Sequence, residues 1–256
     1  MGQALVRCSR RLEGVAIAGA VETAGHAALG RDAGIVAGIG ELGVKVTDDL
    51  RAAIAGADAV IDFSVREAAP ANVRAAAELR RAYVLGTTGL NDGERAAVQR
   101  AAQTVPIVWE PNMSLAVNLL FALVEKAAGV LGPDYDIEIV EMHHRFKKDA
   151  PSGTALRLGE KAAAGRGQAF ASVANYGREG QVGERPRGQI GIHAVRGGDA
   201  VGDHTVLFAT EGERLELTHR ATSREAFAMG ALHAARWVVS QRPRLYDMQD
   251  VLGLNR

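Results

Sequence analysis

The first 114 residues alternate short apolar runs with longer alanine-rich runs, and this alternation constrains the fold more than any other feature. Ala59–Phe63, Tyr83–Leu85 and Ile107–Trp109 are short apolar runs. Segments with helical composition follow them, at residues 68–80 and 92–103 and from residue 115. Strands that alternate with helices are typical of βαβ units, which build a parallel sheet covered by helices. The pattern therefore predicts an α/β domain.

The segments before residue 59 extend the same pattern. Gln3–Arg11 has helical composition, Val15–Val21 is an apolar run that predicts a buried strand ending at Glu22, and Thr47–Ala55 predicts a short helix. Together these elements indicate a Rossmann-like, doubly wound parallel sheet. We expect this dinucleotide-binding domain to span residues 1–114.

The pattern changes in the second half of the chain. Residues 135–142, 189–195, 201–209 and 214–220 read as strands, the last three as antiparallel neighbours, and Glu211–Glu213 reads as the turn of a hairpin. Residues 165–188 lack periodicity and predict a long loop. We expect a second, α+β domain with a mixed or antiparallel sheet at residues 115–222. A helix capped by Ser223 would then return the chain, as residues 223–256, to the first domain.

Composition excludes several classes of partner. The 30 basic and 30 acidic residues cancel, so no net field attracts nucleic acid or an anionic membrane. A single cysteine, Cys8, excludes an internal disulfide and a cysteine-rich metal site, and it fits a reducing cytoplasm. We see no apolar run close to the roughly 20 residues of a membrane span. A small-molecule partner and no metal are expected.

The segment from Glu138 to Leu156 contains the strongest indication of a functional site. Its sequence is EIVEMHHRFKKDAPSGTAL. His143 and His144 follow the predicted strand, and consecutive residues of a strand point to opposite faces, so we expect them to have different roles. Beyond Pro151, Ser152 is a good N-cap for a helix that runs to about residue 164. A helix start offers free N–H groups and a partial positive charge, which suit a carboxylate. The segment therefore combines titratable side chains with an anion-binding helix start.

The dinucleotide-binding pattern is incomplete at its beginning. A glycine-rich loop between a first strand and a helix normally binds the pyrophosphate, yet here the first helix begins at Met1–Gly2. Glu22 closes the strand whose terminal acid would contact the adenine ribose. We expect the true start to lie upstream of Met1; the alternative is a chain that binds its cofactor poorly.

These features together resemble the dihydrodipicolinate reductase family of the lysine and diaminopimelate pathway. The segment from Glu138 to Ala155 is similar to the family pattern E-x-x-E-x-H-H-x-x-K-x-D-x-P-S-G-T-A. The resemblance implies hydride transfer from NADH or NADPH to a cyclic dicarboxylate, giving tetrahydrodipicolinate, in a homotetramer built through the second domain. A hydride that reaches carbon builds negative charge, and His and Lys are suitable acids near neutral pH.

The resemblance also implies residue roles. His143 and Lys147 would be catalytic, and His144, Gly153 and Thr154 would bind the substrate. The implied cofactor-binding residues are Met1, Glu22, Gly86, Thr87, Thr88, Glu110, Pro111, Asn112 and Met113.

Two positions depart from the family pattern. Relatives often carry a basic residue after the ribose-binding acid, where this chain has Thr23, and the 2′-phosphate of NADPH needs a cation, so NADH is slightly favoured. Glu110 stands where a small residue is more common; it is either a solvated charge or a disturbance of the nicotinamide side.

Two other functions compete with the reductase. One is a non-catalytic paralogue that binds a dicarboxylate or acts in assembly; the missing glycine loop favours it, whereas the complete His-His-Lys set argues against it. The other is an oxidoreductase of the homoserine dehydrogenase type, which has no use for the tandem histidines.

Overall fold

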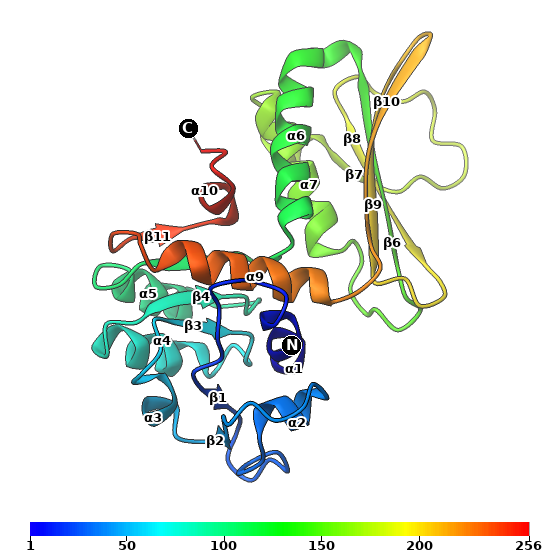
Figure 1. Cartoon of the computed structure of the whole chain (residues 1–256). Helices are drawn as coiled ribbons and strands as arrows, with labels where there is room; N and C mark the ends of the chain where they lie inside the picture. Colours follow the sequence, from blue (N-terminus) through cyan, green and yellow to red (C-terminus); the bar gives the residue numbers. More distant parts are fainter. Residues whose placement is uncertain (256) are drawn as a thin grey trace. The chain divides into compact units, whose positions relative to one another are not determined.

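The computed structural model describes residues 1–255, and these form two compact units. Unit 1 comprises Met1–Leu115 together with the segment that begins at Arg224, and unit 2 comprises Ala116–Ser223. Each observed boundary lies one residue from the corresponding predicted domain boundary. The C-terminal helix thus belongs to the same unit as the N-terminal α/β segment (Figure 1).

Unit 1 is built on a parallel four-stranded sheet in the order β11-β5-β4-β3. Its strands are β3 (Ala59–Asp62), β4 (Ala82–Leu85), β5 (Ile107–Trp109) and β11 (Leu245–Tyr246). The helices of this unit are α1 (Gly2–Ser9), α2 (Ala33–Ala37), α3 (Leu50–Ile54), α4 (Ala69–Glu78), α5 (Asp92–Ala101), α9 (Glu225–Val238) and α10 (Met248–Leu252).

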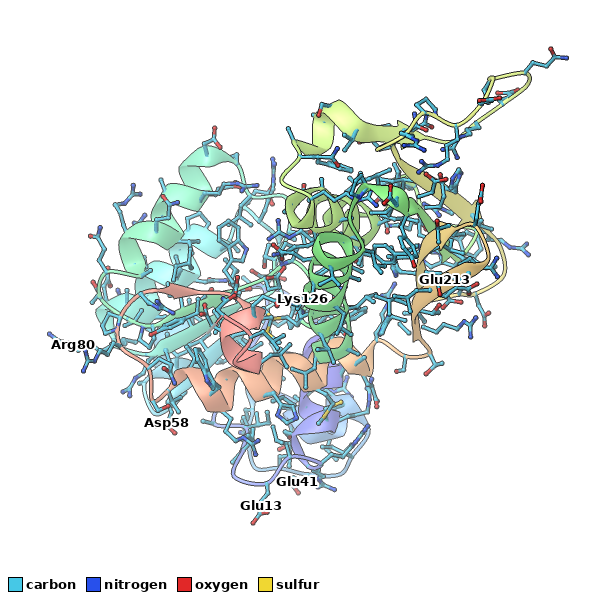
Figure 2. The ribbon with its side chains drawn as sticks, turned by 90° about the horizontal axis from the view of Figure 1, so that it is seen from above. Glu13, Glu41, Asp58, Arg80, Lys126 and Glu213 are labelled. Atoms are coloured by element: carbon cyan, nitrogen blue, oxygen red, sulfur yellow. The ribbon has the colours of Figure 1, made fainter. Side chains whose placement is uncertain are left out.

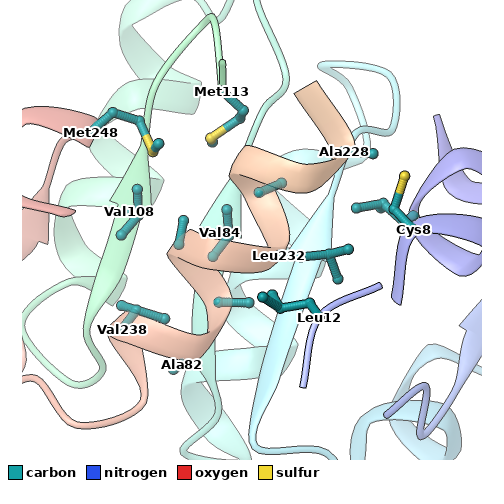
Figure 3. Close-up of a cluster of buried hydrophobic side chains, with 14 of the residues drawn as sticks. Cys8, Leu12, Ala82, Val84, Val108, Met113, Ala228, Leu232, Val238 and Met248 are labelled. Carbon is teal, nitrogen blue, oxygen red and sulfur yellow. The ribbon is translucent and has the colours of Figure 1, made fainter. Parts of the chain in front are cut away.

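Strand β4 shows why the sheet needs helices on both faces. All its residues are buried, and their side chains alternate between two cores. Ala82 and Val84 pack with residues of α1 and α9, and Figure 3 shows this core around Leu232. Tyr83 and Leu85 pack instead with residues of α4 and α5. Burial on both faces is the reason why central parallel strands read as continuous apolar runs, and it confirms the predicted doubly wound arrangement.

The prediction of a buried strand at Val15–Val21 is wrong. Only Ala20–Val21 is a strand, β1, and it pairs in parallel with β2 (Val46–Thr47) in a separate two-stranded sheet. Within residues 1–255, β1 pairs with β2 alone, and β3 pairs with β4 alone. The apolar run has no strand on its other side to bury it, so its residues remain exposed or half-buried.

Unit 2 contains a mixed five-stranded sheet in the order β10-β9-β6-β8-β7. Its strands are β6 (Asp136–His143), β7 (Ala174–Tyr176), β8 (Ile190–Arg196), β9 (Gly202–Thr210) and β10 (Glu213–Ala221). Helices α6 (Leu115–Leu131) and α7 (Gly153–Gly165) pack against one face of this sheet, and α8 (Phe170–Val173) and the short 3-10 helix η1 (Gly132–Asp134) complete the unit. β9 and β10 form the predicted antiparallel hairpin.

Three sequence-based expectations fail locally. β8 is not an antiparallel neighbour of β9; it pairs in parallel with β6. The predicted loop at residues 165–188 contains α8 and β7, elements too short to show periodicity. Helix α9 has Arg224, not Ser223, at its N-cap.

Helix α6 also corrects the expectation about membrane-spanning segments. Together with η1 it forms a helical segment, Leu115–Asp134, that is long and apolar enough to cross a membrane by length and composition, with a mean hydropathy of 1.7. One face of this helix supplies Val117, Phe121 and Val124 to the core of unit 2. Leu119 and Leu123 are exposed on the other side. Packing against the sheet accounts for the apolar character of the first face.

Charged side chains of both signs cover each unit. Figure 2 labels six charged residues that are exposed: Glu13, Glu41, Asp58 and Arg80 in unit 1, and Lys126 and Glu213 in unit 2. This mixture agrees with the zero formal net charge of the chain.

Candidate active site

The predicted cofactor-binding residues of unit 1 gather mainly at one edge of its sheet. Gly86–Thr88 directly follows β4, and Glu110–Met113 directly follows β5. These two strands are parallel neighbours, so their carboxyl ends meet at the same edge, which is where doubly wound sheets bind nucleotides. Gly86 and Thr87 are buried, whereas Thr88 and Pro111 are exposed.

A third loop at this edge was missed by the sequence analysis. It follows β3 and begins at Phe63, whose ring would lie 2.2 Å from a Cβ atom on Gly86, so only glycine allows this close packing. The Thr87 hydroxyl donates a hydrogen bond of 3.0 Å to the carbonyl oxygen of Ser64. The loops after β3 and β4 therefore form one surface.

Asp62, the last residue of β3, stabilises this surface through hydrogen bonds to the loop after β3, to α4 and to β4. Its buried carboxylate accepts hydrogen bonds from the Ser64 N–H at 2.6 Å, from the Asn72 amide at 2.9 Å and from the Tyr83 hydroxyl. Burial and the adjacent Asp62 charge raise the pKa of Tyr83 well above its ordinary value, which keeps its hydroxyl protonated as a donor. The Asp-Phe-Ser sequence at a strand end was the available signal.

Glu22 and Met1 lie outside this sheet edge. Glu22 follows β1 in the small sheet, and its exposed carboxylate accepts a hydrogen bond of 2.9 Å from the Thr23 N–H. Met1 is the N-cap of α1 and makes no side-chain cap. An exposed carboxylate at a strand end and a helix start at Gly2 are groups that suit a ribose and a phosphate, respectively.

The second group of predicted residues lies at the carboxyl end of β6 in unit 2. Ile137, Ile139, Glu141 and His143 alternate along the strand on the face that points to the core. The first two are apolar and the last two are polar, so the core face ends in a buried polar cluster. His143 is only 9% exposed, whereas His144, the first residue after the strand, is half-buried. That the two histidines point to opposite faces stays a prediction.

The polar cluster contains four residues from strands, on the same face of the sheet. The register pairs His143 with Arg196 on β8 and Glu141 with His204 on β9. The Nδ1 atom of His143 lies 2.6 Å from Oε2 of Glu141. The rings of His143 and His204 meet edge to face, with their centroids 5.3 Å apart.

Ser152 connects this cluster to the start of α7. It is the N-cap of α7, and its hydroxyl oxygen accepts a hydrogen bond of 3.2 Å from the Ala155 N–H. The same hydroxyl lies 3.0 Å from Nε2 of His204. The predicted N-cap is therefore confirmed, and it places Gly153 and Thr154 at the helix start beside the cluster, where the N–H groups of a first turn favour an anion.

Lys147 lies in the loop between β6 and α7. Its ammonium group contacts both carboxylate oxygens of Asp149, at 2.8 and 2.9 Å, and its side chain is 20% exposed. The neighbouring Lys148 is exposed. Of the two tandem lysines, Lys147 is thus the one that the loop holds in place.

Lowering the pH is expected to destabilise the chain through His204. Burial, followed by the proximity of His143, lowers the pKa of His204 to about 3. The unfolded chain binds this proton with a pKa of about 6.5, so the stability from neutral His204 is complete above that pH and is lost as the pH falls toward 3. Between pH 8 and pH 5 this loss is about 2 kcal/mol.

Urea unfolding of the wild-type chain and of His204→Gln at several pH values measures this effect. The variant should lose about 2 kcal/mol less over the same interval. Burial also lowers the pKa values of His219 and His233, but these two residues remain in both chains and cancel in the comparison. Parallel stability curves for the two chains would contradict the assignment.

Sequence reasoning missed Glu141, Arg196 and His204 as members of the site, and it predicted Ser152 only as the N-cap of the anion-binding helix start. The spacing of Glu141 and His143, two residues apart on a strand, was the one available signal. No group of three or more His, Cys, Asp or Glu residues that could hold a metal ion occurs within residues 1–255.

The fold and the two residue groups define a class of protein: a two-unit α/β oxidoreductase of the dinucleotide-binding kind. Comparison with known families makes this specific. The family model described as "Dihydrodipicolinate reductase, N-terminus" matches residues 1–113, and the model described as "Dihydrodipicolinate reductase, C-terminus" matches residues 116–252. The chain belongs to the dihydrodipicolinate reductase family.

Individual relatives agree with this assignment. The chain is 56% identical to the 4-hydroxy-tetrahydrodipicolinate reductase of Anaeromyxobacter dehalogenans strain 2CP-1, over 99% of this chain and 94% of that protein. It is 48% identical to the enzyme of the same name from Geotalea daltonii, over 99% of this chain and 95% of that one.

Solved structures support the fold. Dipicolinate-bound dihydrodipicolinate reductase from Paenisporosarcina sp. TG-14 is similar with a TM-score of 0.75 at 22% identity, and the match covers 97% of this chain and 94% of that one. The amine dehydrogenase of Mycobacterium smegmatis is similar with a TM-score of 0.59 at 12% identity, over 96% of this chain and 91% of that one.

Proposed function

We propose that this chain is a 4-hydroxy-tetrahydrodipicolinate reductase, which transfers a hydride from a reduced nicotinamide cofactor to a cyclic dicarboxylate and so serves lysine and diaminopimelate biosynthesis. The observation that carries the proposal is the cluster in unit 2. A histidine bonded to a buried carboxylate, an ordered lysine and a helix start lie at the end of one strand. A protein that only bound a dicarboxylate would not need the two proton donors.

The residues of unit 1 fit a nicotinamide dinucleotide. When bound, the reduced cofactor supplies the hydride. The surface formed by Gly86–Thr88 and Glu110–Met113 would hold the nicotinamide side, since both segments follow strands of the parallel sheet. Glu22 would accept hydrogen bonds from the adenine ribose, and Met1 would lie near the pyrophosphate at the start of α1. Glu110, at one end of this surface, is half-buried.

We further propose that NADH is preferred. The backbone N–H of Thr23 is bonded to Glu22, and the side chain of Thr23 carries no charge. The 2′-phosphate of NADPH needs a cationic neighbour, which neither Glu22 nor Thr23 provides. We expect the enzyme to act in the cytoplasm, where its single, buried cysteine remains reduced.

In the reaction, residues of unit 2 orient the substrate and supply the proton. Gly153 and Thr154 at the start of α7 would bind one substrate carboxylate, and His144 would hold the ring from the loop after β6. Lys147 or His143 would donate a proton as the hydride reaches the neighbouring carbon, so that the negative charge left by the hydride is neutralised. A proton donor placed in this way contributes about 10² to 10⁴ in rate.

The decisive experiment is a reductase assay of this chain with each cofactor. Oxidation of NADH or NADPH is followed by absorbance in the presence of the cyclic dicarboxylate, with a matched reaction that lacks the dicarboxylate. We expect dicarboxylate-dependent oxidation, with a larger kcat/KM for NADH than for NADPH. Absence of oxidation with both cofactors would reject reductase activity of this chain, and a preference for NADPH would reject the cofactor assignment.

We also propose that the chain forms a homotetramer through the sheet of unit 2. The face opposite α6 and α7 carries apolar side chains on adjacent strands: Val140, Met142, Val195 and Leu207. Val195 is 43% exposed, and apolar residues on an open sheet face favour association. Sedimentation equilibrium should give four times the chain mass of 27.0 kDa. A monomer at micromolar concentration would contradict this proposal.

A further inference from the structure

Glu141 is bonded through both of its carboxylate oxygens, although no proton transfer has been assigned to it. It is fully buried. Its Oε2 atom lies 2.6 Å from His143 Nδ1 and accepts a bond of 2.8 Å from Arg196 Nη1. Its Oε1 atom accepts bonds of 2.9 Å from Arg196 Nη2 and 3.0 Å from the Ser152 N–H. All these contacts are within hydrogen-bond distance, and the two from Arg196 lie in the range of charge-assisted bonds.

The charge state of this carboxyl group decides the proton position on His143. Burial raises the pKa of Glu141, but the bonds from Arg196, His143 and the Ser152 N–H outweigh that effect and hold it below its ordinary value. The group is therefore a carboxylate, which can only accept hydrogen bonds. The contact of 2.6 Å then requires a proton on Nδ1 of His143. In the neutral ring this leaves Nε2 as the atom that exchanges protons.

The space beside the Nε2 atom of His143 allows this atom to exchange a proton. A Cβ atom on Gly202 would lie 3.0 Å from His143 Nε2, so a side chain at this position would press against the ring. His204, whose pKa is about 3, remains neutral and adds no charge beside His143.

Arg196 extends the same network to the other parts of the site. Besides its paired bonds to Glu141, it donates a bond of 2.7 Å to the carbonyl oxygen of Asp149, the residue whose side chain binds Lys147. Glu141 in turn accepts the Ser152 N–H at the start of α7. The pair thus connects the imidazole, the lysine loop and the helix start.

We infer that Glu141 and Arg196 form a positioning pair: Glu141 fixes the Nδ1–H tautomer and the orientation of His143, and Arg196 balances the charge of Glu141 and ties it to the Lys147 loop. This role rests on the proposed reductase function. Neither residue contacts the reacting atoms; they act through His143 and Lys147.

The variant Glu141→Gln tests the inference with a defined outcome. Each Glu141 oxygen faces two donors: the Ser152 N–H and Arg196 Nη2 at Oε1, and Arg196 Nη1 and His143 Nδ1 at Oε2. Of these four atoms only His143 Nδ1 can lose its proton and become an acceptor, so the amide oxygen of glutamine belongs at the Oε1 position. Its NH₂ group then faces His143 Nδ1 and donates to it, which favours the Nε2–H tautomer. We expect kcat to fall by about 10²-fold, since loss of the correct tautomer or of a supporting hydrogen bond has effects of this order or larger. KM for the dicarboxylate should change less than about threefold, because the residues that we propose to bind the substrate are unchanged.

The tautomer is read directly from ¹⁵N spectra of histidine-labelled protein at pH 8.5, where imidazole rings are largely neutral. Glu138→Gln is the matched control. Glu138 lies on the opposite face of β6, and its carboxylate likewise binds arginines and a histidine, His193, whose Nε2 atom lies 2.6 Å away. In this control the His193 signals should change and those of His143 should not.

The outcomes separate this inference from the proposed function. Inversion of the His143 tautomer together with a lower kcat supports the positioning role. An Nε2–H tautomer of His143 already in the wild type overturns it, and so does a normal kcat in Glu141→Gln; the wild-type spectrum needs no variant to fold. A wild-type chain without reductase activity would instead reject the proposed function, while the tautomer would still report the geometry.

Discussion

Replacing His143 by alanine is expected to lower kcat by about 10² to 10⁴, the usual range for loss of a positioned proton donor or acceptor. Lys147→Ala should cause a decrease of the same order, because the ordered ammonium group beside Asp149 is the second proton donor that we propose. KM for NADH should stay nearly constant in both variants, since the proposed cofactor-binding residues belong to unit 1.

Steady-state kinetics with the dicarboxylate at saturation measures both effects. Lys148→Ala is the control, because Lys148 is adjacent in sequence and has the same charge but is exposed. It should retain most of the wild-type kcat. Near-normal kcat in both His143→Ala and Lys147→Ala would contradict the roles that we propose for these residues. A decrease of kcat in Lys148→Ala as large as that in Lys147→Ala would indicate a general effect of positive charge.

The substitution Gly230→Ala is expected to cost about 3 kcal/mol or more of unfolding free energy, at the upper end of the range for overpacked cores. Gly230 lies in α9, where a Cβ atom would be only 1.7 Å from the carbonyl oxygen of Met113. Met113 is itself buried in the core between α9 and the sheet, so neither backbone segment can move without loss of packing.

Urea unfolding of the variant tests this expectation, with Gly93→Ala as the control. Gly93 lies in α5, and the nearest atom to its added Cβ, at 3.4 Å, is at ordinary contact distance. Alanine is a better helix former than glycine, so the control should be unchanged or up to about 1 kcal/mol more stable. A Gly230→Ala chain as stable as the wild type would show that α9 can shift away from Met113.

Elements with a strong local signal were predicted well. β5 has the predicted bounds, α6 begins at the predicted residue, and β3, β4, α4 and α7 lie within a few residues of their predicted bounds. These segments have a clear apolar period, or an N-cap such as Ser152. Prediction failed where the sequence signal was weak or misleading. Elements α8 and β7 are too short to show a periodic pattern. Val15–Val21 has the composition of a buried strand, but no neighbouring strand buries it.

The candidate site was predicted only in part, for the same reason. His143, His144, Lys147, Gly153 and Thr154 lie close together in sequence, and the family pattern names them. Arg196 and His204 come from β8 and β9, where no local pattern marks them as part of a site, and Phe63 and Ser64 come from the loop after β3, where the only signal was Asp-Phe-Ser at a strand end. Their place depends on which strands are neighbours, and the parallel pairing of β6 with β8 was not predicted.

The sequence by itself determined the order of most helices and strands, the change from a parallel to a mixed sheet, and the cluster of titratable residues after β6. These properties depend on contacts between residues a few positions apart, which leave a periodic pattern. Only the tertiary structure decided that Glu141 meets Arg196 across 55 positions and that Ser152 meets His204 across 52. Such hydrogen bonds form because strand register brings distant residues onto one face, and buried polar groups must find partners wherever the fold supplies them.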